Sequence, residues 1–114
     1  MKKFFPLFSL ALFFSNCTSV STEDLTIPAP SIITYTANVK SIIDQSCATS
    51  GCHNAAGNSG NLILEDFAQV RNAFLNRNAL GRMESTSNPM PPTGNLPTTS
   101  IQVIKDWMEQ GYIE

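Results

Sequence analysis

The stretch Cys47-Ala48-Thr49-Ser50-Gly51-Cys52-His53 carries the most specific chemistry in the sequence. Two thiols stand five positions apart, and a histidine follows directly after the second thiol. His53 is the only histidine in the chain, and two of the three cysteines lie in this stretch. Gly51 has no side chain, which helps the segment between the thiols to turn back on itself. We therefore expect the domain to fold around this heptapeptide.

A Cys-x-x-Cys-His run is a c-type haem attachment motif. The present stretch has the same arrangement with two more residues between the cysteines. Each thiol can add to a haem vinyl group, and the neutral imidazole beside the second thiol can then bind the iron. The sequence therefore predicts thioether attachment through Cys47 and Cys52 and an axial bond from His53. It leaves open whether one thiol or both form thioethers.

Two other interpretations of these residues stay open. Cys47 and Cys52 could form a disulfide, which is common in exported domains. Cys47, Cys52 and His53 could instead be three ligands of a zinc ion. Zinc sites usually have four ligands, and the chain has no fourth cysteine and no second histidine, so an Asp or Glu would have to complete the set.

The first 16 residues have the pattern of an export signal. Lys2 and Lys3 precede an apolar run over residues 4–14, which is too short to cross a bilayer as a helix. Residues 13–17 resemble a bacterial lipoprotein cleavage site, in which the cysteine becomes the lipidated first residue. We expect residues 1–16 to be a signal peptide and Cys17 to be acylated. The alternative is a plain secretory signal, which would leave Cys17 as an unpaired thiol.

Residues 17–31 are rich in Ser, Thr and Pro and have no hydrophobic period, which predicts a flexible tether between the lipid and the domain. Loss of Lys2 and Lys3 with the signal would leave five basic and nine acidic residues, so the net charge would move from −2 to −4. No basic stripe is present, which argues against nucleic-acid binding. The expected location is the bacterial cell envelope, with the protein lipid-anchored to a membrane and facing the periplasm or the cell surface.

Residues 32–114 have the size of one domain. A domain this small buries little core and usually needs a staple such as a metal, a disulfide or a cofactor. Helical spacing of apolar residues predicts a first helix over residues 35–46, which leads directly into Cys47. Thr36 or Asn38 is the expected cap of this helix.

Two further helices are expected. The second begins near Asp66 and ends before Gly81. The third begins with a capping box of Thr99 and Gln102 and ends at Gly111. Irregular loops are expected over residues 54–61 and 81–97. No strand pattern of any length competes with these helices, so the expected fold is all-α.

Residues 35–112 resemble the small c-type cytochrome domain found in exported bacterial proteins. The matching segments are Ile-Ile-Asp-x-x-Cys at 42–47, Ser-Gly-Cys-His at 50–53, Asn-Leu-x-Leu at 61–64, Met-Pro-Pro at 90–92 and Ile-x-x-Trp-x-x-x-Gly at 104–111. The cysteine spacing is wider than in the commonest pattern of the family, and no proline follows His53 closely. In the family, the carbonyl of that proline often accepts the proton of the haem histidine. Another backbone carbonyl, from residues 57–61, is therefore expected to orient His53 here.

The resemblance implies an all-α fold of three main helices around one covalently bound haem c. It also implies that His53 binds the iron on one side and a methionine binds it on the other, an arrangement that raises the haem potential. Met90 is the expected ligand because it lies among prolines, as the ligand methionine of the family does. Met83 is its rival.

Three arginines and the tryptophan complete the candidate residues. Arg82 could pair a haem propionate through its planar guanidinium, or it could be a solvated loop arginine. Arg71 and Arg77 have the spacing of solvated helix faces. Trp107 is expected to pack between the first and last helices.

The resemblance thus implies a monohaem electron carrier, not an enzyme, that exchanges electrons with a redox partner protein. A haem enzyme or enzyme subunit of the peroxidase kind, with an open iron site, is one alternative. A disulfide-bridged helical lipoprotein that binds a partner without haem is the other. Apart from His53 the chain offers no histidine, and no paired acid and base carboxylates are evident.

Overall fold

The computed structural model describes residues 30–114 of the chain. The expected signal peptide, Cys17 and nearly all of the expected tether lie outside the described residues. Residues 30–114 contain helices and no β-strand, so the all-α prediction holds for this part of the chain. None of these helices has the length and apolar character needed to cross a membrane.

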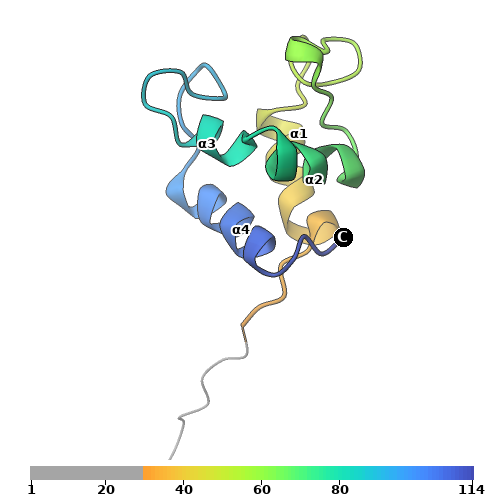
Figure 1. The fold of residues 1–114 in the computed structure, drawn as a ribbon, viewed down its shortest axis with the longest axis vertical. Helices are drawn as coiled ribbons and strands as arrows, with labels where there is room; N and C mark the ends of the chain where they lie inside the picture. The colour runs from red at the N-terminus through yellow and green to blue at the C-terminus, as the bar shows by residue number, and fades with distance from the viewer. Residues whose placement is uncertain (1–29) are drawn as a thin grey trace, which may run out of the picture.

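The described part contains four α-helices, where the sequence predicted three main ones. In chain order the elements are η1 (Tyr35–Val39, a π-helical turn), α1 (Lys40–Ser46), η2 (Ser59–Asn61, a 3₁₀ turn), α2 (Phe67–Asn76), α3 (Ala79–Met83) and α4 (Thr98–Glu109). Figure 1 shows η1 and α1 as one continuous helical segment beside α4, with α2 and α3 crossing above α4. The chain enters this arrangement close to where it ends.

The first helical segment is capped by Thr34, so the expectation of Thr36 or Asn38 as the cap is wrong. The hydroxyl of Thr34 accepts a hydrogen bond from the Ala37 N–H at 3.1 Å. Asn38 contributes in the opposite direction, because its side-chain oxygen accepts from the Thr34 N–H at 2.9 Å. Two backbone donors that have no partner within the helix are thus satisfied reciprocally.

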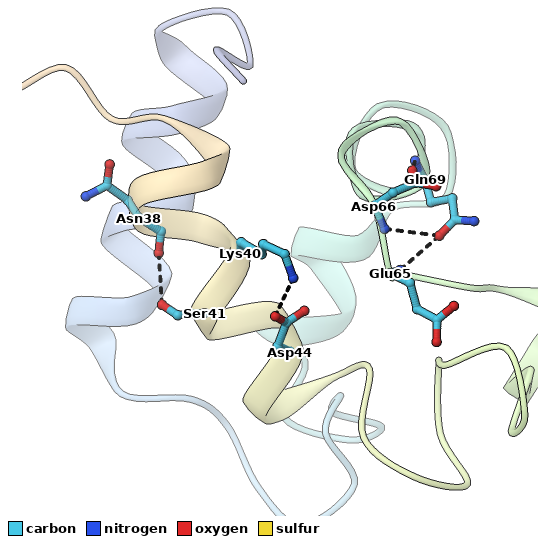
Figure 2. Close-up of polar contacts among 7 residues, drawn as sticks. All are labelled: Asn38, Lys40, Ser41, Asp44, Glu65, Asp66 and Gln69. Carbon is cyan, nitrogen blue, oxygen red and sulfur yellow. Dashed lines mark hydrogen bonds and ion pairs between the residues drawn. The ribbon is translucent and has the colours of Figure 1, made fainter.

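Helix α2 begins near Asp66 and ends before Gly81, as predicted; its last residue is Asn76. Asp66 accepts from the Gln69 N–H at 2.8 Å and donates its own N–H to the Gln69 side chain at 3.3 Å, which completes a capping box (Figure 2). Asn78 then adopts a left-handed conformation with φ +52°, which asparagine tolerates better than most residues. The helix therefore breaks, and α3 carries the chain through Gly81 to Met83, where the sequence predicted a loop.

Helix α4 has nearly the predicted extent, but its predicted capping box is not formed. Pro97 precedes the first turn, and no side chain caps it. The side chain of Gln102 instead donates to Asp106 one turn further on, at 2.7 Å. Proline is compatible with this position because its fixed φ suits the start of a helix.

The end of α4 matches the prediction. Gly111 has φ +90°, and its N–H donates to the Met108 carbonyl at 3.1 Å. The Tyr112 N–H donates to the Trp107 carbonyl at 3.0 Å. These two bonds form a Schellman motif, which turns the chain back toward the core.

Trp107 lies at the centre of the core and is fully buried. Its indole N–H donates to the Ile113 carbonyl at 2.7 Å, so its one polar atom is satisfied inside the protein. Trp107 packs against the first helical segment, as predicted, and also against α2. The distances from its ring centroid are 4.9 Å to Tyr112, 5.9 Å to Phe74, 6.2 Å to Tyr35 and 6.4 Å to Phe67.

Replacement of Trp107 by alanine should lower the free energy of unfolding by about 3–5 kcal/mol, because it leaves a large cavity among four aromatic rings. Leu75→Ala is the control, since Leu75 lies on α2 with 46% of its surface exposed, and it should cost less than about 1 kcal/mol. Chemical denaturation followed by circular dichroism measures both values. Equal losses in the two variants would contradict the central position of Trp107.

Candidate functional site

The predicted attachment stretch closes into a compact loop directly after α1. The His53 N–H donates to the Cys47 carbonyl at 3.0 Å, and the Cys52 N–H donates to the Thr49 carbonyl at 3.0 Å. Gly51 has φ +78°, a conformation that glycine adopts without steric cost. These bonds bring the two ends of the stretch together, so the wide spacing of the cysteines is taken up inside one closed loop.

The following loop packs tightly onto this stretch. A Cβ atom on Gly57 would lie 2.5 Å from the carbonyl carbon of Gly51 and 2.6 Å from the nitrogen of Cys52. The Gly57 N–H donates to the Asn54 side chain at 2.7 Å, and the Ser59 N–H donates to the Cys52 carbonyl at 3.0 Å. Only glycine fits at position 57. The loop around Gly57 and Ser59 packs against the backbone of Cys52 and holds it in place.

The imidazole of His53 is oriented by a backbone carbonyl, as expected, but the carbonyl belongs to Leu62 rather than to residues 57–61. The Nδ1 atom lies 3.0 Å from the Leu62 oxygen. A carbonyl can only accept, so Nδ1 carries the proton in this contact, and Nε2 of the neutral ring keeps its lone pair. The backbone of His53 is held as well, because its carbonyl accepts from the Leu64 N–H at 2.8 Å.

A cavity of about 330 Å³ opens beside His53. This volume is within the range of small-molecule and cofactor sites, about 300–1,000 Å³. Its walls are mainly apolar. A smaller pocket of about 70 Å³ contains Cys52 and shares several residues with the cavity. The apolar wall of the cavity comprises Ile43, Leu62, Leu64, Phe74 and Ala79.

The two cysteines are free thiols and are not joined by a disulfide. Cys47 lines both the cavity and the smaller pocket, while Cys52 lines the smaller pocket. Burial raises the pKa of the Cys47 thiol to about 11, with a smaller contribution from the neighbouring Cys52. Cys47 is therefore protonated at neutral pH. Within residues 30–114, no group of three or more His, Cys, Asp or Glu side chains is arranged to hold a metal ion.

Both candidate methionines line the cavity with His53. Met83 lies on α3 with 3% of its surface exposed and belongs to the core cluster. Met90 is half-buried in the proline loop and also lines the smaller pocket beside Cys52. The Met90 N–H donates to the Arg82 carbonyl at 2.9 Å, which ties the loop to α3.

Two arginines reach the cavity. Arg82 lines it, as the sequence analysis allowed, and its Nε atom is buried without a hydrogen-bond partner within the described part of the chain. Arg77 is exposed, in keeping with its interpretation as a solvated residue, and it also lines the cavity and donates from Nη2 to the Gly60 carbonyl at 3.3 Å. Arg71 lies over the Tyr112 ring at 5.7 Å. A buried donor without a partner is costly, and a guanidinium pair suits a carboxylate-bearing ligand.

No protein-family model, curated protein or solved structure matches this chain. The site geometry and the sequence pattern together carry the functional conclusion. They bring one free thiol, an oriented imidazole, two methionines and two arginines to one apolar cavity, and they bring the second thiol to the pocket that adjoins it.

Alkylation of Cys47 by iodoacetamide at pH 8 should be about a hundredfold slower in the folded chain without cofactor than in the same chain in urea. The reason is that a pKa near 11 leaves far less thiolate than the ordinary value of 9.0 does. The rate should rise with pH until the pKa is passed. A Cys17→Ser/Cys52→Ser chain isolates the Cys47 signal, and mass spectrometry measures it. Equal rates in buffer and in urea would contradict the burial of Cys47.

Proposed function

We propose that the protein is a monohaem c-type electron carrier of the bacterial cell envelope. The observation that carries this proposal is the convergence of Cys47, Cys52, His53 and Met90 on one apolar cavity and the pocket adjoining it. Met90 is distant from the other three in the sequence, and the break after α2 and the proline loop bring it back to them. The apolar walls of the cavity suit the apolar face of a large flat cofactor.

The two thiols would hold haem c by thioether bonds. Both are free, and both lie beside the imidazole that follows them in the chain. Closure of the loop by the His53 N–H and the Cys47 carbonyl keeps thiols and imidazole on one short rigid segment. Support of the Cys52 backbone by the Gly57 region further limits its movement.

The axial bonds would come from His53 and Met90. The bond from Nδ1 to the Leu62 carbonyl leaves Nε2 of His53 as the ligand atom and raises its basicity. Met90 is the better second ligand, since Met83 is committed to the core while Met90 lines both the cavity and the pocket beside Cys52. Haem iron held in this way supplies a one-electron couple with a raised potential.

The arginines at the cavity would balance the negative charge of the haem carboxylates. Arg82 offers a buried Nε that has no partner within the protein, and Arg77 offers a guanidinium at the same cavity. Charge-assisted hydrogen bonds of this kind are about twice as strong as neutral ones. The envelope location and the lipid anchor on Cys17 rest on the sequence pattern of residues 1–17.

The protein made in a strain that matures c-type cytochromes should show one reversible one-electron couple in a redox titration. Its reduced form should not change its spectrum under carbon monoxide, because two protein ligands leave no open position on the iron. Rapid binding of carbon monoxide, together with peroxidase turnover, would favour the haem enzyme over the carrier.

Met90→Ala should remove the long-wavelength absorption band that a sulfur–iron bond gives in the oxidised protein. It should also lower the potential and open the iron to carbon monoxide and cyanide. Met83→Ala is the matched control. It should leave these properties nearly unchanged while destabilising the fold by about 2–5 kcal/mol, because Met83 is a buried core residue. The reverse result would make Met83 the ligand.

Cys17→Ser should release the protein from the membrane fraction or leave it unprocessed, without a change in haem content per chain. A lipid on Cys17 is the only anchor that the sequence analysis predicts for the mature protein. Cell fractionation and a haem stain measure the two properties. A Cys17→Ser protein that stayed in the membrane fraction in the same processed form would end the lipoprotein proposal.

A further inference from the structure

Two long segments of the described chain contain no charged residue. Asp, Glu, Lys and Arg are absent over residues 45–64 and again over residues 85–104. All five basic and seven acidic residues of the described part lie outside these two segments. Such an uneven distribution gives the molecule surfaces of different electrostatic character.

The two uncharged segments meet at the mouth of the site. An open groove of about 410 Å³ is lined by Gln45, Ser46, Thr49 and Cys52 from the first segment and by residues 91–96 from the second. We call these residues the neutral face. The loops of both segments lie at the end of the domain that is farthest from the C-terminus (Figure 1).

Three of the four charges that border the uncharged segments in the sequence are in ion pairs, and the fourth, Glu65, accepts a hydrogen bond from the Ala55 N–H at 3.0 Å. Asp44 directly precedes Gln45 and forms an ion pair with Lys40 along the helix (Figure 2). Glu84 directly precedes the second segment and pairs with Lys105 at 2.6 Å. Paired charges largely cancel each other's field at a distance, so these two ion pairs add little net potential beside the neutral face.

We propose that the neutral face is the docking surface for the redox partner and that this partner presents an uncharged contact surface of its own. The inference rests on the proposed function, because Cys52 of the face and the adjoining pocket belong to the haem site. An acidic or basic patch would lose its water here without gaining a counter-charge, which is costly. Prolines and short polar side chains lose little conformational entropy on contact.

Electron self-exchange between oxidised and reduced copies of the haem-loaded protein tests this proposal. A second copy of the protein carries the same uncharged face, so it serves as a probe for a partner with an uncharged contact surface. The self-exchange rate, measured by NMR line broadening, should change less than about twofold between about 0.01 M and about 0.15 M ionic strength, because docking involves no steering charges.

Thr93→Lys puts like charges on both docking faces and should slow self-exchange at least threefold at low salt, with recovery at high salt. Exchange between Thr93→Lys and Thr93→Glu copies should recover or exceed the wild-type rate. A Thr93→Glu copy stands in for a partner with a charged contact surface. The rate of its electron exchange with the wild-type protein should be lower than the rate of wild-type self-exchange. Thr36→Lys, the same change on exposed η1 at the other end of the domain, should leave the rate within about 1.5-fold of wild type.

Equal slowing by Thr36→Lys and Thr93→Lys would overturn the proposal, because electrons would then not pass through the neutral face. A steep salt dependence of wild-type exchange, or faster exchange between wild-type and Thr93→Glu copies, would overturn the uncharged partner. The redox titration is done first. A protein that shows no reversible one-electron couple there would overturn the haem proposal and the docking proposal together.

Discussion

The orientation of the His53 ring is the constraint on which the rest of the site depends. Its Nδ1 atom is bound to the Leu62 carbonyl, and its backbone is bound at both ends, to Cys47 and to Leu64. Leu64 is a buried core residue, so the heptapeptide is fastened to the core through the segment that follows it. A change in that segment would tilt the imidazole even though both thiols stayed in place.

The small size of the domain explains why the core and the site are so closely connected. Trp107 and its aromatic neighbours pack between the first helical segment, α2 and α4. One of those neighbours, Phe74, also forms part of the cavity wall. A chain of this size buries little apolar surface by itself. A bound haem would add its apolar face to the same core at the cavity, so loading with the cofactor and stability of the fold should rise together.

Local patterns predicted the elements that depend on neighbouring residues. The start of α2 near Asp66, the stop at Gly111 and the turn at Gly51 are each decided within a few positions of the chain. The break at Asn78 could not be predicted in this way, because Ala79 follows Leu75 four positions later, at the spacing of a continuous helix. The left-handed conformation of Asn78 turns that pattern into two helices.

This break also explains where several site residues lie. It places Met83 on a buried helix rather than in a loop, and it brings Arg77 to the same cavity as Arg82. The carbonyl that binds His53 was expected within residues 57–61, but it belongs to Leu62, the next residue in the chain. The reason is that the 3₁₀ turn η2 reverses the chain before Leu62. Such reversals depend on how the loop packs against Gly57, which sequence spacing does not reveal.

Covalent attachment is tested most directly by the intact mass of the mature protein from a host that matures c-type cytochromes. The account predicts a mass that exceeds the processed polypeptide by one haem. The colour should remain with the protein after denaturation and acid–organic extraction, and digestion should leave the haem on the peptide that contains Cys47 and Cys52. A colourless protein of unmodified mass, with Cys47 and Cys52 joined in a disulfide, would contradict it.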